Sequence, residues 1–257
     1  MFLVMNDVLN AFYTLLWPFT RISAALLVAP IFSARSVNLR VRIMLALGLT
    51  FVIYPLYDWP ILDVLSGEGL FIMAQQAVLG IIMGLIIQIA FAAITAAGDF
   101  IAISMGLSFA MMADPNNGHQ TPILSQFFVI LASLLFLSIG GHLVLIEMLL
   151  DSFRLMPIDG VRLDLAIIHD FIQWSGIIFA GGMMIALPVM VTLLVTNMAM
   201  GVVARAAPTL NIFAVGFPAA MLVGFVTLVI LIPSMTTGME KLWVDSYHQV
   251  QIYMGVE

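Results

Sequence analysis

The sequence contains no cysteine. This absence excludes disulfide bonds, zinc–thiolate sites and cysteine nucleophiles. Charge is also scarce, since Asp, Glu, Lys and Arg make up 9% of the 257 residues, against about 25% in a typical soluble domain. Only 8 residues are basic and the net charge is -6. We therefore expect no nucleic-acid partner, because the chain has no basic face that could neutralise phosphates.

Motifs for catalysis and cofactor binding are missing as well. The chain has no His-Glu-x-x-His pair, no Gly-x-Ser-x-Gly elbow and no phosphate-binding glycine loop. His142 and Glu147 lie five positions apart in one apolar segment, a spacing that fits a packing pair better than a metal site. We therefore expect no cofactor or metal, and an intramembrane hydrolase that depends on His142 is the weakest alternative.

Long hydrophobic runs are abundant. Two uncharged stretches, 171–204 and 206–239, are separated only by Arg205. About 20 apolar residues cross the hydrocarbon of a bilayer as a helix, so each stretch is long enough to span. With 63% hydrophobic residues overall, the sequence predicts an all-α protein that is associated with a membrane.

The chain reads as about six long helices with one or two short ones, in a single domain covering residues 1–257. The expected apolar segments are 8–32, 43–57, 70–97, 100–113, 122–150, 171–204 and 206–239, followed by a mixed tail at 240–257. Asp99 is expected to separate the third segment from the short fourth one. Pro188 and Pro218 each remove one hydrogen bond inside a long helix, so both predict kinks.

Small residues mark expected helix contacts. Gly80 and Gly84 form a Gly-x-x-x-Gly pair, and Gly216, Ala220 and Gly224 repeat that spacing. In lipid, small residues allow two backbones to approach closely, and this packing helps drive helix association.

Arg21 is the charge that is hardest to explain, because it lies near the middle of the first apolar segment. A charged residue in the middle of a membrane costs at least about 2.5 kcal/mol. We expect Arg21 to snorkel or to pair with a partner carboxylate in a packed bundle, and a role in transport is the alternative.

The segment 105–113 is apolar, too short to span, and ends at the turn signal Asp114-Pro115. It contains Met105, Met111 and Met112. Methionine is flexible and fills irregular gaps, and a hydrophobic constriction can close a pore by excluding water. From these residues alone, both a gate and an ordinary re-entrant helix remain open.

One string near the end of the chain has a specific spacing of charged, aromatic, glycine and proline residues. Its members are Arg205, Pro208, Asn211, Phe213, Gly216 and Pro218. The string closely resembles the signature of the FliR family of flagellar biosynthetic proteins. Further matches follow in the family's order: Arg21, Pro30, Phe32, Arg42, 105–110, Asp114-Pro115, Gly141-His142, Ser152-Phe153, Pro157, Pro188 and Asn197. Asn38 departs from the pattern, because proline is expected there.

The resemblance implies a non-enzymatic core subunit of the flagellar type III export gate in the bacterial inner membrane, at the flagellar basal body. Such subunits form a helical pore with FliP, FliQ and FlhB homologues, next to further export proteins such as FlhA, and unfolded flagellar subunits leave through it. The family folds as kinked helical hairpins surrounded by lipid and partner subunits. Residues 1–165 would be the FliP-like part, and 166–257 the FliQ-like hairpin with its C-terminal tail.

The resemblance also implies that the central loop, about 106–120, plugs the closed pore. The residues assigned to this plug are Met105, Gly106, Phe109, Met111, Met112, Asp114 and Pro115, of which Phe109, Met111 and Met112 would seal the pore. Arg21 and the residues of the 205–218 string would pack subunits or pair charges. The alternative is a secondary transporter or proton channel that acts alone, for which Asp99 is the first carboxylate to test.

Overall fold

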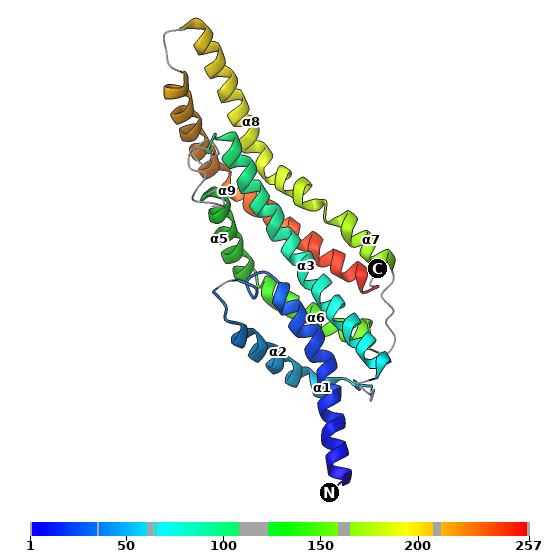
Figure 1. The fold of residues 1–257 in the computed structure, drawn as a ribbon. Coiled ribbons are helices and arrows are strands. Elements are labelled where there is room, and N and C mark those ends of the chain that lie inside the picture. Colours follow the sequence, from blue (N-terminus) through cyan, green and yellow to red (C-terminus); the bar gives the residue numbers. More distant parts are fainter. Residues whose placement is uncertain are drawn as a thin grey trace. The chain divides into compact units, whose positions relative to one another are not determined.

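The computed structural model describes residues 2–34, 36–60, 64, 66–107, 123–158, 165–207 and 212–255, and all regular secondary structure in these ranges is helical (Figure 1). The predicted all-α class is therefore confirmed. The elements are α1 (Phe2–Val28), α2 (Leu39–Ile53), the 3-10 turn η1 (Tyr54–Leu56), α3 (Gly67–Ser104), α5 (Ile123–Ser138), α6 (Gly141–Leu155), α7 (Leu165–Trp174), α8 (Ile177–Ala206) and α9 (Ile212–Tyr253).

Four stretches of the described chain are long and apolar enough to cross a membrane. They are Leu39–Leu56, Gly67–Ser104, Ile167–Ala206 and Val215–Tyr253, and a fifth span is possible if α5 and α6 act as one broken span. With 38 and 42 residues, α3 and α9 are about 57 and 63 Å long. Both are about twice as long as a hydrocarbon layer of roughly 30 Å requires.

Several segment boundaries differ from those expected. The stretch 171–204 is divided between α7, which ends at Trp174, and α8, which begins at Ile177. Helix α3 continues through Asp99 to Ser104, because the Asp99 carboxylate accepts a hydrogen bond from the Ser125 hydroxyl and needs no break in the helix. The segment 122–150 is broken instead, since Gly140 adopts φ +74° between α5 and α6. The tail does not form a separate piece, because α9 runs without a break to Tyr253.

The predicted kink positions both lie inside long helices. Pro188 lies within α8, and α9 contains Pro218 together with Pro233. Pro188 and Pro218 are both exposed. The kinks themselves stay predictions.

The chain divides into two compact units that are each built from separate segments. Unit 1 contains Met1–Gln88, Gly140–Ser175 and Asp245–Glu257, and unit 2 contains Ile89–Ile139 and Gly176–Val244. Each unit draws residues from both sides of the boundary expected near residue 165. The division into FliP-like and FliQ-like parts remains a prediction from the resemblance.

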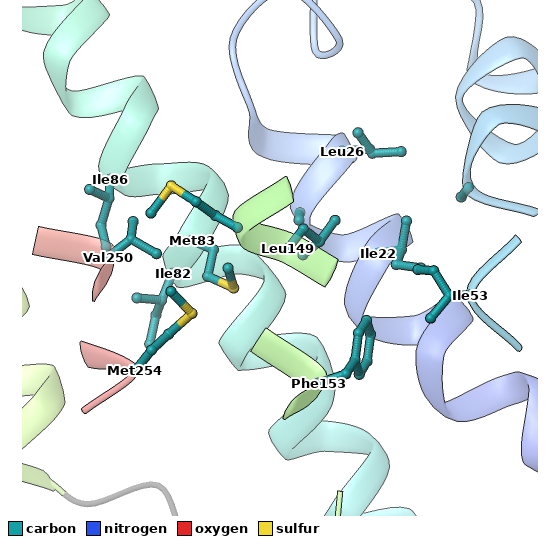
Figure 2. Close-up of a cluster of buried hydrophobic side chains, with 13 residues drawn as sticks. Ile22, Leu26, Ile53, Ile82, Met83, Ile86, Leu149, Phe153, Val250 and Met254 are labelled. Atoms are coloured by element: carbon teal, nitrogen blue, oxygen red, sulfur yellow. The ribbon is translucent and has the colours of Figure 1, made fainter. Parts of the chain in front are cut away.

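The core of unit 1 joins residues from five helices (Figure 2). Its members include Ile22, Leu26, Ile53, Ile82, Met83, Ile86, Leu149, Phe153, Val250 and Met254. At Gly84 of α3, an added Cβ would lie 2.6 Å from the carbonyl oxygen of Ala25 on α1, and at Gly80 it would clash with the carbonyl oxygen of Arg21. The close approach predicted from the Gly80 and Gly84 pair is therefore confirmed.

The core of unit 2 is built around three aromatic rings. Phe91 of α3, Phe136 of α5 and Trp243 of α9 pack against one another with ring centroids 5.3–5.7 Å apart. Helix α8 approaches α3 closely, because a Cβ on Gly182 would lie 2.8 Å from the carbonyl oxygen of Ala93. Small residues therefore set helix spacing in this unit as well.

Candidate functional site

Arg21 lies fully buried in unit 1, and its guanidinium group is held by acceptors on two other parts of the chain. Its Nε donates to Gln76 Oε1 at 2.8 Å, and its Nη2 donates to the same oxygen. Its Nη1 donates to the carbonyl oxygen and the Oγ of Ser152 at 2.8 and 3.1 Å. Nη2 also donates to the carbonyl oxygen of Met156 at 2.9 Å. All of these acceptors are electrically neutral.

Arg21 belongs to α1, but its guanidinium group lies at the C-terminal end of α6. This position explains how the buried charge is tolerated. Helix α6 ends at Leu155, and the C-terminal end of a helix carries partial negative charge from its last carbonyl groups. The Arg21 Cζ also lies 4.4 Å from the centroid of the Phe153 ring, a favourable geometry for a cation. Helix dipole, carbonyls and ring together replace the carboxylate that a buried arginine usually requires.

The expectation that Arg21 would snorkel or pair with a carboxylate is wrong, because Arg21 is fully buried and its acceptors are neutral. Sequence reasoning did not identify Gln76 as a partner. The sequence did contain a sign of this partner, since Gln75 and Gln76 are two adjacent polar residues in a span without any charged residue. Gln76 is fully buried, and a buried amide needs a hydrogen-bond partner. A charge and an amide in two apolar segments are natural candidates for each other.

The loop between α1 and α2 is organised by Arg42, whose Nη2 donates to the carbonyl oxygens of Ala34 and Val37 at 2.8 and 3.0 Å. Asn38, where the resemblance leads us to expect proline, is the N-cap of α2. Its Oδ1 accepts from the backbone N–H of Arg40 at 3.2 Å. Asparagine thus favours the start of α2 by capping a free backbone N–H. A proline at this position would favour it by restricting φ.

Two of the predicted gate residues form the end of α3 in unit 2. Gly106 has φ +79°, and the N–H groups of Gly106 and Leu107 donate to the carbonyl oxygens of Ile103 and Ala102. This is the Schellman arrangement that ends a helix at a left-handed glycine. Met105 is 1% exposed and packs on Gly224 of α9. The string Met105-Gly106 therefore ends a helix and anchors it.

The other gate residues, Phe109, Met111, Met112, Asp114 and Pro115, lie outside the described residues. So do Pro208 and Asn211, and Phe213 lies in the first turn of α9 with its side chain outside the description. The roles assigned to these residues stay predictions.

The remaining residues of the 205–218 string occupy two helix ends. Arg205 is exposed in the last turn of α8, where a positive charge is favoured by the helix dipole. Gly216 is half-buried and Pro218 is exposed in the first turns of α9. The exposure of Arg205 leaves its charge accessible to another molecule, and its pairing with another subunit stays a prediction.

The start of α5 contains a residue that sequence reasoning missed. Ser125 is fully buried, and its hydroxyl donates to Asp99 on α3. A Cβ on Gly98 would lie only 2.6 Å from the Ser125 Cα. The sequence did contain a sign of this contact. Ser125 is a small hydroxyl residue just after the central loop, and Asp99 had no evident partner in the sequence.

Unit 2 also carries an open apolar hollow of about 360 Å³ along α8. Its lining consists of Ser104, Met183, Leu187, Met190, Val191, Leu193, Leu194 and Asn197. Within the described ranges, His, Asp and Glu side chains form no group of three or more that could hold a metal ion.

Comparison with known proteins places these features in a family. The family described as "Bacterial export proteins, family 1" matches residues 12–246. The chain is 38% identical over 244 residues to the flagellar biosynthetic protein FliR of Pectobacterium carotovorum subsp. carotovorum, which covers 94% of this chain and 92% of that protein.

Two further relatives carry the same description. The flagellar biosynthetic protein FliR of Escherichia coli (strain K12) is 39% identical over 232 residues, or 90% of this chain and 89% of that protein. The one from Bacillus subtilis (strain 168) is 31% identical over 229 residues and 88% of each chain. The chain therefore belongs to the bacterial export proteins, family 1, and is a flagellar biosynthesis and export protein of the FliR type.

Proposed function

We propose that this chain is a non-enzymatic core subunit of the flagellar type III export gate. With FliP and FliQ homologues, and next to FlhB and FlhA homologues, it forms the inner-membrane pore of the basal body. Unfolded flagellar subunits pass through this pore. The central loop, about 106–120, plugs the pore when no subunit is passing.

The observation that carries this proposal is the exposure of the long apolar helices. An 18-residue apolar window of Val215–Tyr253 is only 17% buried inside the chain, and the corresponding window of Ile167–Ala206 is 33% buried. Leu222, Val229 and Ile230 of α9 are 66–70% exposed. Exposed apolar faces of this size mark contact with lipid or with other proteins. Because α9 is much longer than a bilayer is thick, lipid alone does not account for its length.

The plug role is supported by the way the ends of the central loop are held. Met105 precedes the loop and is buried, and Leu124 and Ser125 follow it and are buried as well. Firm ends allow a loop to block an opening without being carried away by the passing chain. Phe109, Met111 and Met112 would supply the seal, because flexible thioethers and an aromatic ring can close around irregular shapes.

The two arginines have different roles in this proposal. Arg21 is satisfied inside unit 1 and stabilises the subunit itself. Arg205 is exposed, and it pairs with an acidic residue of a neighbouring subunit, because an unpaired charge in an apolar setting is costly.

The test replaces residues 106–120 by a Gly-Ser link of the same length, in cells that express the complete export apparatus. We expect the membrane to become permeable to small ions, measured as loss of membrane potential or as potassium efflux. The matched control is the same replacement of the connection 159–164, which should leave the membrane tight. Wild-type tightness after replacement of 106–120, with the chain still assembled, would contradict the plug.

A further inference from the structure

Helix α2 differs from the other long apolar segments because its length fits a bilayer. Together with η1 it forms the candidate span Leu39–Leu56 of 18 residues, which is about 27 Å long at the rise of an α-helix. The hydrocarbon layer of a membrane is roughly 30 Å thick. The other three continuous candidate spans in the described ranges have 38–40 residues, roughly twice the number that this layer requires.

One side of α2 packs on its own unit. Ala46, Thr50 and Ile53 are buried, and Ala46 and Ile53 belong to the core of unit 1. Their spacing of four and three residues places them in one row along the helix. Because only 17% of the apolar window is buried, most of the surface of α2 is not covered by its own chain.

A different side of α2 is apolar and exposed. Met44, Leu47 and Phe51 are 72%, 40% and 63% exposed, and their spacing of three and four residues forms a second row. Val52 and Leu56 continue this surface to the end of the span with 64% and 67% exposed. An exposed apolar face of this kind marks contact with lipid or with another protein.

The two ends of the exposed face carry residues that are typical of membrane surfaces. Arg40 is exposed in the first turn of α2, four residues before Met44 and therefore on the same side. Tyr57 and Trp59 directly follow the span and are half-buried. Tyrosine and tryptophan are enriched where hydrocarbon meets water. Asp58 is exposed between them, a charge that the hydrocarbon layer would not readily accept.

Of the two arginines at the start of α2, Arg40 is the one that is available to lipid. The Arg42 guanidinium donates to the carbonyl oxygens of Ala34 and Val37, so its charge is used in the loop before α2. The Arg40 guanidinium makes no hydrogen bond or ion pair within the part of the chain that the structure describes. An arginine with a flexible stem can reach the phosphate groups at the membrane surface, and anionic lipids attract it.

From these observations we propose that the exposed face of α2 is the lipid-contact surface of unit 1. Arg40 binds the phosphate of an anionic phospholipid in one leaflet, and Tyr57 and Trp59 lie at the head groups of the other leaflet. Lipid fits this face better than a partner subunit, because its length, its basic start and its aromatic end match the layers of a bilayer. This contact goes beyond the proposed function, since it fixes the depth of the subunit in the membrane whatever passes through the pore.

The first test identifies what covers α2. Phe51, or in a second variant Ile230 of α9, is replaced by the photoreactive amino acid benzoylphenylalanine in cells that express the complete export apparatus. After irradiation, adducts of the purified chain with phospholipid and with protein are measured by mass spectrometry and immunoblot. Position 51 should give severalfold more lipid adducts than protein adducts. Position 230, where Ile230 is 68% exposed, should give mainly protein adducts. Met44 is the second position on α2 for the same replacement.

The second test measures the phosphate contact. The assembled complex in detergent is titrated with phosphatidylglycerol, and the bound lipid is measured by native mass spectrometry. Arg40→Gln should weaken binding about fivefold, the loss expected for one arginine beside anionic lipid. Arg154→Gln is the matched control, because Arg154 is also exposed but lies in the last turn of α6. This variant should bind the lipid like wild type.

An excess of protein adducts at position 51 would overturn the lipid contact of α2. Wild-type affinity of Arg40→Gln, or an equal loss in Arg154→Gln, would overturn the phosphate contact. The α9 variant separates this inference from the proposed function. Lipid adducts alone at position 230 would contradict the partner contact of α9, whereas the lipid contact of α2 is decided by position 51.

Discussion

Helices α3 and α9 are similar in length and composition but differ in how they are covered. In α3 the 18-residue apolar window is 67% buried inside the chain, whereas in α9 it is 17% buried. Ile86, Ile87, Ile94 and Ile101 of α3 are fully buried, while Val229 and Ile230 of α9 are about 70% exposed. One long helix is therefore satisfied by its own chain, and the other requires contacts from outside it.

This difference separates the stability of the folded chain from the stability of its assembly with other molecules. Contacts of α3 with α1 and α6 determine whether the chain folds. In the proposed gate, contacts of the exposed α9 face would determine whether the folded chain assembles. Substitutions on the two helices should therefore produce different failures, even when the residue types are the same.

The largest expected effect comes from a polar substitution in the α3 core. Ile86→Asn should destabilise the chain by about 4 kcal/mol, because it removes buried hydrocarbon and adds a buried polar group without a partner. The same change on α9, Ile230→Asn, should leave the amount of chain in the membrane near wild type and reduce the amount of partner subunits that co-purify. Immunoblots of membranes and of purified complexes measure the two quantities. Equal losses of chain for both variants would contradict the difference between the helices.

Removal of the Arg21 charge should have the next largest effect. Arg21→Met should cost about 3 kcal/mol, because Gln76, Ser152 and Met156 lose a donor that reaches all of them. Arg21→Lys should recover only part of the loss, since an ammonium group cannot reproduce the planar arrangement of donors. Thermal unfolding in detergent measures both values. A variant Arg21→Met as stable as wild type would show that these hydrogen bonds are dispensable.

A substitution at the crossing of α1 and α3 should have a somewhat smaller effect. Gly84→Val should cost about 2 kcal/mol, because a Cβ would meet the Ala25 carbonyl oxygen at 2.6 Å and the helices would have to separate. Gly48→Val on α2 is the control, since no atom lies within 4 Å of a Cβ at that position. The same unfolding measurement applies, and equal stability of the two variants would argue against the close crossing.

The smallest effect is expected at a local feature outside both long helices. Asn38→Ala removes the side-chain acceptor at the start of α2 and should cost about 1 kcal/mol. Asn38→Asp should retain the stability, because a carboxylate caps the Arg40 N–H equally well. If Asn38→Ala lost more stability than Gly84→Val, Asn38 would have to make further stabilising contacts besides the helix cap.

Much of this fold follows from the sequence, because the length of each uncharged apolar stretch indicates where a long helix can form. The charge-free stretches around residues 171–239 predicted α8 and α9, and the spacing of Gly80 and Gly84 predicted a close helix contact. The boundaries at Asp99 and Gly140 were expected wrongly. Asp99 is compatible with a helix interior because Ser125 satisfies it, and a one-dimensional pattern does not show that partner.

The surroundings of Arg21 illustrate what the sequence leaves open. Its partners Gln76 and Ser152 are 55 and 131 positions away, so only the packing of α1 against α3 and α6 brings them together. Sequence reasoning identified the costly charge and expected its burial in a bundle. It could not predict that carbonyl oxygens at the end of α6 and the Gln76 amide oxygen inside α3 would supply the acceptors.

The central claim is that the exposed apolar face of α9 is covered by partner subunits around a pore. The most direct test is to extract the tagged chain from native membranes in a mild detergent and to determine the mass and composition of the intact particle by mass spectrometry. We expect one large complex that contains FliP and FliQ homologues in excess over this chain. Recovery of the chain as a solitary monomer, with the export apparatus present in the same membranes, would contradict the claim.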